Sequence, residues 1–221
     1  MPRRYSVELF LKQAELFKGL SAEERQRVAS FSHERHFDKG ETVFHEGRPS
    51  ESVWLVMEGR VHLLHYLSTG RAQGSCVMTP GETFCCLPTL DQGLYPATAV
   101  AATSSRLLQI PMRLFHDLMG SSPQLLRETL CVFGGRLRQV EARQCLVHDP
   151  VEQRVAQVLL TLQKKFGGSI PLTRKEIAEL VGTTVETAIR TIRRFQEEGW
   201  VRSVRGKMEL LNPERLSQLL R

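Results

Sequence analysis

The stretch LTRKEIAELVGTTVETAIRTIRRF, at residues 172–195, contains two helical patterns separated by a single glycine. Thr173 precedes the first pattern and Thr184 precedes the second, and threonine is a preferred cap at a helix N-terminus. Gly182 provides the tight turn between them. The apolar positions are Ile177 and Leu180 in the first helix and Val185, Ala188, Ile192 and Phe195 in the second. Two helices in this arrangement predict a helix-turn-helix.

The second helix carries two residues that can contact bases. Glu186 and Arg190 lie one turn apart, off the apolar stripe and near the N-terminal end, where recognition helices meet base edges. Arginine can donate two hydrogen bonds to guanine, and glutamate can accept one from the amino group of cytosine. The alternative is an ion pair on a solvated helix face, which contributes only about a few tenths of a kcal/mol.

The residues that follow supply further positive charge. Arg193 lies on the same helix, and SVRGKME predicts a wing hairpin with Arg205 and Lys207 at its tip, suited to phosphate contact. Residues 150–221 contain 13 Lys and Arg against 8 Asp and Glu, whereas residues 1–149 contain 17 against 16. A basic excess confined to this segment is what binding to a polyanion requires. We therefore expect double-stranded DNA as its partner.

Residues 37–110 have the pattern of a β-domain. Short runs rich in β-branched and aromatic residues, among them TVFHEG, SVWLVMEGRVHLLHYL and RLLQI, alternate with glycine turns. This spacing predicts a small antiparallel β-barrel or jelly roll, with Glu58 and Gly59 in a hairpin turn between two strands. Ahead of it, Ser21 and Glu24 form a capping box that predicts a short helix.

A long helix is predicted between the β-domain and the helix-turn-helix. Ser122 is its candidate cap, Pro123 takes the first helical position, and Asp149-Pro150 ends the helix and marks a hinge. Its apolar residues follow a heptad spacing and are Leu126, Leu130, Phe133, Leu137, Val140 and Val147. Such a seam can pack on the neighbouring barrel, but its length favours a symmetric dimer. The predicted domains are 1–120, 121–149 and 150–221.

Composition points away from membranes, export and disulfides. No apolar run approaches the ~18 residues of a membrane helix, and the N-terminus has no signal-peptide pattern, so we expect a cytoplasmic protein. The five cysteines have no CxxC or zinc-finger spacing. In a reducing compartment they are expected to be thiols, and we expect no resident metal site.

Over essentially the whole chain, this order of elements resembles the CRP/FNR superfamily of bacterial transcription regulators. The motifs that carry the resemblance are KGETVFHEG, VWLVMEGRV and LTRKEIAELVGTTVETAIRTI. It implies an α+β fold with an N-terminal antiparallel β-barrel of the jelly-roll, cyclic-nucleotide-binding-like type, a long dimerisation helix and a C-terminal winged helix-turn-helix. It also implies a homodimer that regulates transcription, with RNA polymerase as a candidate partner; activator is the working description, and the choice between activator and repressor stays open.

The resemblance assigns roles to individual residues. Glu186 and Arg190 match the pair that recognises a G·C step in each half-site of an inverted repeat. The positions that match phosphate contacts are Thr173, Gly182, Thr184 and Thr187. Val185 matches the oxygen-sensing branch, whereas Ile189 departs from both main branches. The central G is therefore expected, and the outer bases of the half-site stay open.

The resemblance also indicates what the barrel does not bind. In the cyclic-nucleotide branch, a Gly-Glu pair and an Arg-Ser pair hold the nucleotide, and these fall on Cys85-Cys86 and Pro96-Ala97 here. Asp91 is the only charged residue in FCCLPTLDQGLYPATAV and would repel a phosphodiester. Cyclic AMP is therefore not expected as the effector. The iron–sulfur branch is excluded as well, because its cysteines cluster near the N-terminus and the first cysteine here is at position 76.

Three interpretations of Cys85 and Cys86 stay open. Buried cysteine is a small hydrophobe, so the pair can simply fill the barrel. Alternatively, the thiols react with an oxidant or bind a soft metal, which requires a lowered thiolate pKa and some exposure. The third is haem, because the carbon-monoxide-sensing branch begins Met-Pro, as this chain does, and ligates iron through the position of Cys85. That branch's histidine ligand corresponds to Leu87, for which His62 or His65 would have to substitute.

Two other classes of function fit parts of the sequence. A cupin-like enzyme would use the barrel, but His62 and His65 form no H-x-H plus carboxylate set, and no nucleophile–base pair is evident. A protein–protein adaptor would use the winged domain without contacting bases. The expected function is a non-enzymatic, sequence-specific regulator controlled by a signal other than a cyclic nucleotide, with the cofactor unknown and haem as a candidate.

Overall fold

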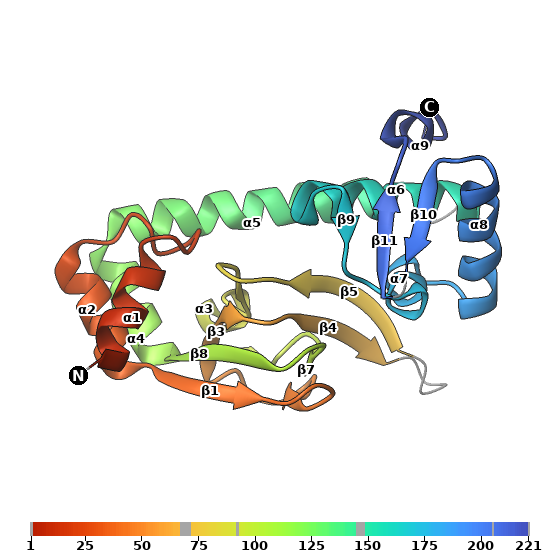
Figure 1. The fold of residues 1–221 in the computed structure, drawn as a ribbon. Coiled ribbons are helices and arrows are strands. Elements are labelled where there is room, and N and C mark those ends of the chain that lie inside the picture. The colour runs from red at the N-terminus through yellow and green to blue at the C-terminus, as the bar shows by residue number, and fades with distance from the viewer. Residues whose placement is uncertain (1, 67–71, 92, 145–148, 205, 221) are drawn as a thin grey trace. The chain divides into compact units, whose positions relative to one another are not determined.

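Two antiparallel sheets occupy the part of the chain in which strands are predicted (Figure 1). The structure is a computed structural model that describes residues 2–66, 72–91, 93–144, 149–204 and 206–220. The first sheet has the order β1-β8-β3-β6 and the second β2-β7-β4-β5. Their strands are β1 (His33–Phe37), β2 (Thr42–Phe44), β3 (Ser52–Glu58), β4 (Val61–Tyr66), β5 (Ala72–Met78), β6 (Thr83–Phe84), β7 (Thr98–Ala101) and β8 (Ser105–Pro111). The predicted antiparallel β-domain is confirmed, although the ladders between the described strands do not close the sheets into a barrel.

Strand β3 is buried on both faces, which explains why its sequence is almost continuously apolar. Successive side chains of a strand point to opposite faces. Val53 and Leu55 therefore face a core that the strand shares with the helices, whereas Trp54 and Val56 face a core built by both sheets. Strand β3 thus separates two hydrophobic cores.

The turn at Glu58 and Gly59 is present, but the predicted hairpin is wrong. The two strands that it joins, β3 and β4, belong to different sheets and do not pair with each other. Gly59 has a φ of +83°, and a Cβ there would lie 2.5 Å from the carbonyl oxygen of Ser104 and 2.4 Å from Oγ of Ser105. Glycine is required because this turn packs tightly on residues 104–105, where β8 begins.

Helices cluster at one end of the sheets (Figure 1). They are α1 (Pro2–Leu11), α2 (Ala22–Phe31) and α4 (Met112–Ser121), with the short α3 (Leu87–Leu90) and the beginning of the long α5 (Pro123–Gln144). The predicted capping box is confirmed, since Ser21 Oγ accepts from the backbone of Glu24 and Glu24 accepts from the backbone of Ser21. Their apolar faces bury Leu11, Val28, Phe115, Leu118 and Leu125 in the helix-side core, where Phe17 from the turn between α1 and α2 joins them. The β-domain therefore has a helical layer on one side of β3.

The chain divides into two compact units, residues 1–65 with 75–137 and residues 66–74 with 138–221. The second contains α6 (Val151–Phe166), β9 (Ser169–Ile170), α7 (Arg174–Val181), α8 (Val185–Glu197), β10 (Val201–Val204), β11 (Lys207–Leu210) and α9 (Pro213–Gln218). Its small sheet has the antiparallel order β10-β11-β9. In the part of the chain that the structure describes, no helix is both long and apolar enough to cross a membrane.

Candidate nucleic-acid interface

The helix-turn-helix is formed by α7 and α8, and local capping sets both helix starts. Thr173 Oγ1 accepts from the backbone of Glu176 at 3.2 Å, and the Glu176 carboxylate accepts from the backbone of Thr173 at 2.6 Å. Gly182 adopts the left-handed conformation that ends α7. Thr184 Oγ1 then accepts from the backbone of Thr187 at 3.1 Å to start α8. The predicted caps at Thr173 and Thr184 and the predicted turn at Gly182 are confirmed.

Helix α8 buries one stripe and exposes the opposite one. The buried residues are Ala188, Thr191, Ile192 and Phe195, whereas Val185 is half-buried at the edge of the stripe. On α7 the prediction was wrong for Leu180, which is half-buried, because Ala178 and Val181 join Ile177 on the inner face instead. The outward residues of α8 include Glu186, Ile189, Arg190 and Arg193, all of them exposed.

Glu186 and Arg190 do not neutralise each other. Both side chains are exposed, and among the described residues neither has an ion pair. Their neighbour Arg194 behaves differently. It pairs with Glu152 of α6 and, through Nε at 3.1 Å, with Glu198. Only Arg194 is committed to internal contacts, so Glu186 and Arg190 remain available on the surface.

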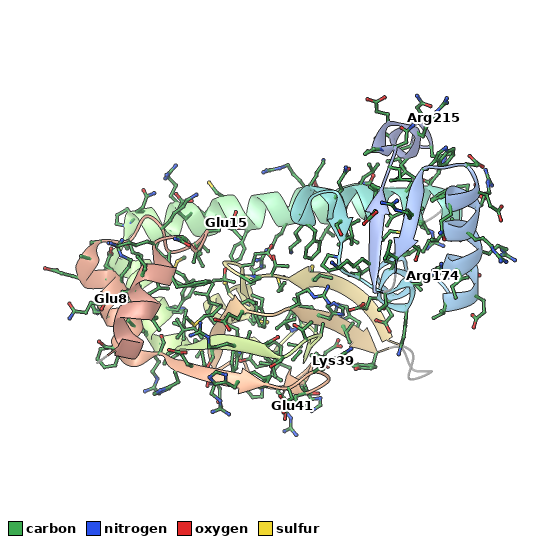
Figure 2. The ribbon with its side chains drawn as sticks, in the orientation of Figure 1. Glu8, Glu15, Lys39, Glu41, Arg174 and Arg215 are labelled. Carbon is green, nitrogen blue, oxygen red and sulfur yellow. The ribbon has the colours of Figure 1, made fainter. Side chains whose placement is uncertain are left out.

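Two open grooves lie on the same unit and share Arg174, and neither is lined by Glu186 or Arg190. The first, of about 560 Å³, is lined by Arg174, Ile189, Arg193, Gln196 and Glu197. The second, of about 460 Å³, is lined by Leu172, Thr173, Arg174, Lys175, Ser203, Val204, Gly206 and Lys207. Arg174 Nη2 donates to Gln196 Oε1 at 3.2 Å, and Figure 2 labels this arginine on α7. Sequence reasoning missed Arg174 and Lys175, although basic residues directly after the cap Thr173 were a usable signal.

The predicted wing is an antiparallel hairpin of β10 and β11. Val204 pairs with Lys207 at its tip, where Gly206 has a φ of +75°. Arg202 and Glu209 form a cross-strand ion pair with N–O distances of 2.8 and 2.5 Å. Lys207 is exposed, and Arg205 lies outside the described residues. The wing therefore presents at least one cation next to the second groove.

The two adjacent cysteines of the β-domain are buried in different cores. Cys85 packs with Phe44, Trp54 and Tyr95 between the sheets, whereas Cys86 packs in the helix-side core. Cys85 has a φ of +61°, and among the described residues it is the only non-glycine residue with a positive φ. Consecutive side chains thus enter separate cores here, as they do along β3.

The environment of both thiols opposes ionisation. Burial raises the pKa of Cys86 to about 11, and burial together with the neighbouring thiol raises the pKa of Cys85 further above its ordinary value. Arg136 of α5 donates a hydrogen bond to the carbonyl oxygen of Thr83 and lowers both values only in part. A reactive thiolate needs the opposite conditions, namely exposure and a lowered pKa.

The other residues predicted for this region lie in different surroundings. By the resemblance, Pro96 and Ala97 correspond to the phosphate-binding Arg-Ser pair of the cyclic-nucleotide branch. Pro96 is exposed and Ala97 is buried. His62 is buried on β4, and His65 Nδ1 lies 3.3 Å from Glu46 Oε1 at the surface. The described residues contain no group of three His, Cys, Asp or Glu side chains that could hold a metal ion.

The heptad seam of α5 is largely uncovered within one chain. Leu130 and Leu137 are 62% and 59% exposed, and Leu126 and Val140 are exposed as well. Phe133 instead packs partly against the helix-side core, and Val147 lies outside the described residues. The alternative in which the seam packs on its own β-domain therefore fails for Leu126, Leu130 and Leu137, which belong to the same unit as that domain.

Comparisons with known proteins agree with this architecture. Residues 34–122 match the family described as the cyclic nucleotide-binding domain, and residues 153–219 match the Crp-like helix-turn-helix domain. The chain is 28% identical over 211 residues to the Cyclic AMP receptor protein of Thermus thermophilus, which covers 95% of this chain and 98% of that protein. It is 27% identical over 218 residues to the Nitrogen fixation regulation protein FixK of Bradyrhizobium diazoefficiens, covering 95% and 91%.

A solved structure, FixK2 from Bradyrhizobium japonicum, superposes with a TM-score of 0.76 at 26% identity and covers 85% of this chain and 96% of that one. These relatives are regulators rather than enzymes. The two family matches fall on the two units built above, and the relatives span nearly the full length of the chain. The chain thus belongs to the CRP/FNR superfamily of bacterial transcription regulators, and it is a DNA-binding regulator with a helix-turn-helix of this type.

Proposed function

We propose that the protein acts as a homodimer that recognises an inverted repeat, with Glu186 and Arg190 contacting a G·C step in each half-site. The observation that carries this proposal is that both side chains are exposed opposite the buried stripe of α8, with no ion pair to any described residue. A bidentate arginine on guanine and a glutamate on the paired cytosine use the full donor and acceptor pattern of that base pair.

Phosphate contacts would orient this helix in the major groove. The candidates are Thr173, Gly182, Thr184, Thr187, Arg193, Arg205 and Lys207, to which the grooves add Arg174 and Lys175. Thr173 and Thr184 sit at the N-termini of α7 and α8, where unpaired backbone N–H groups favour anions. Arg193, with no ion pair to a described residue, is the better phosphate ligand of the two adjacent arginines, because Arg194 is already paired.

The exposed seam of α5 supports a twofold dimer. Leu126, Leu130, Leu137 and Val140 follow one heptad face and are exposed in the single chain. Association of two such helices would bury this face and place two recognition helices symmetrically. Symmetric recognition helices require half-sites about one helical turn, or roughly 10 base pairs, apart.

The signal at the β-domain is proposed to be something other than cyclic AMP. The segment after Thr83 offers no cation to a phosphodiester, and its one charge, Asp91, is negative. The buried thiols of Cys85 and Cys86, whose pKa values are raised, act in this proposal as packing groups. Haem as a cofactor, and contact with RNA polymerase, stay predictions.

The decisive experiment compares base preference in matched variants. An inverted-repeat duplex selected by the wild type from a randomised library supplies the probe, and fluorescence anisotropy at one fixed salt concentration supplies the affinity. Replacing the G·C step by A·T should cost the wild type about 1–3 kcal/mol per half-site. Arg190→Gln should lose this preference and shift toward A·T, because glutamine makes its paired hydrogen bonds with adenine rather than with guanine.

The control variant is Arg215→Gln, because Arg215 is an exposed arginine on α9, at the other end of the wing strands from Arg174 (Figure 2). It should keep the full preference for G·C. Retention of that preference by Arg190→Gln would overturn the proposal.

A further inference from the structure

Ile189 is an exposed aliphatic residue on the face of α8 that is otherwise charged. Its side chain is 37% exposed, and it takes no part in the buried stripe formed by Ala188, Ile192 and Phe195. An apolar side chain at such a place gains nothing from water. Single exposed apolar residues are common on protein surfaces, but Ile189 lies on the face of α8 that is proposed to meet DNA, where its exposed part is open to a contact.

The helix geometry places Ile189 beside the proposed base-contacting pair. At 3.6 residues per turn, three residues bring Ile189 to within about 60° of Glu186 around the helix axis. Arg190 is its direct neighbour, and Arg193 lies one turn further on and lines the same groove. Because isoleucine is branched at Cβ, its rotamers in a helix are few and its methyl groups are held in a defined direction.

The chemistry of the side chain selects its partner. Isoleucine has no hydrogen-bond donor or acceptor, so it leaves the polar edges of guanine, cytosine and adenine unsatisfied, which is unfavourable when water is excluded. The one apolar group that bases present in the major groove is the 5-methyl group of thymine. We propose that Ile189 recognises a thymine methyl in a base pair next to the G·C step. This inference rests on the proposed function of Glu186 and Arg190.

The test removes one methyl group from the DNA and one side chain from the protein. In a panel of symmetric duplexes the G·C step is kept, and the base pair on one side of it or on the other is varied through all four possibilities. The wild type should bind most tightly when thymine occupies one of these places. Replacing that thymine by deoxyuridine deletes only the methyl group and should weaken binding about fourfold per half-site, hence about 16-fold for the symmetric duplex.

Ile189→Ala should show a smaller difference between the thymine and deoxyuridine duplexes than the wild type, because the short alanine side chain contacts less of the thymine methyl. Alanine favours helix, and the position is outside the buried stripe, so the variant is expected to fold. Leu211→Ala is the matched control, since Leu211 is an exposed apolar residue of the same unit outside α8 and both grooves. It should keep the wild-type difference. A full thymine preference in Ile189→Ala, or none in the wild type, would overturn the inference.

Arg190→Gln separates this outcome from failure of the proposed function. If Ile189 acts as inferred, loss of the G·C preference in Arg190→Gln leaves a measurable difference between thymine and deoxyuridine. If base contact through α8 is wrong altogether, neither substitution changes any base preference.

Discussion

Substitution of Gly59 by alanine tests the tight packing between the turn after β3 and the link before β8. A left-handed backbone costs a non-glycine residue about 1–2 kcal/mol, of which roughly 0.4–1 kcal/mol is regained from the lower entropy of the unfolded chain. The added Cβ would also lie 2.5 Å from the carbonyl oxygen of Ser104 and 2.8 Å from Cα of Ser105. Backbone atoms cannot rotate aside as a side chain can, and overpacking of this kind costs about 1–3 kcal/mol.

Gly47→Ala provides the matched control. Gly47 has a φ of +77°, close to the +83° of Gly59, but a Cβ there meets nothing within 4 Å. The two variants therefore share the backbone cost, and their difference isolates the close approach. We expect Gly59→Ala to lose about 1–3 kcal/mol more of the free energy of unfolding than Gly47→Ala.

Urea denaturation followed by tryptophan fluorescence measures this difference. The chain has two tryptophans, Trp54 in the β-domain core and Trp200 beside Phe195 in the winged unit. Both glycine variants are made in a Trp200→Phe background, so that the signal of Trp54 reports on the β-domain alone. Equal losses of stability at equal protein concentration would refute the argument from close approach.

Two further predictions follow from the buried thiols and the exposed seam. Burial raises the pKa of Cys86 from 9.0 to about 11. The free energy of unfolding is therefore unaffected by this thiol below pH 9, where it is protonated in both the folded and the unfolded chain. Between pH 9 and 11 only the unfolded chain loses the proton, which lowers the free energy of unfolding by up to about 3 kcal/mol. Urea unfolding at stepped pH should show a flatter alkaline loss in Cys86→Ala, and an identical slope would contradict the prediction. Leu137→Glu places a charge on the exposed seam and should shift the protein from dimer to monomer in sedimentation velocity. The control Leu211→Glu should remain a dimer. A Leu137→Glu variant that stays dimeric would contradict the proposal that this seam is the dimer interface.

The helix-turn-helix could be predicted from the sequence because its determinants are local. Thr173, Gly182 and Thr184 act on backbone groups no more than four residues away, so their effect does not depend on the rest of the fold. The same holds for the capping box at Ser21 and for the tight turn at Gly206 in the wing. The heptad spacing on α5 likewise reports a stripe on one helix, of which Leu126, Leu130 and Leu137 are exposed and Phe133 packs partly against the helix-side core.

Other features depend on residues far apart in the sequence, and only the tertiary structure decided them. Arg193 and Arg194 are indistinguishable by sequence, yet Arg194 alone meets Glu152, 42 residues away. Cys85 and Cys86 are adjacent, but the sheets and helices packed around them place one in each core. Strand periodicity predicts which side chains share a face, whereas the choice of partner strand and the identity of the buried neighbours are set by packing across the whole domain.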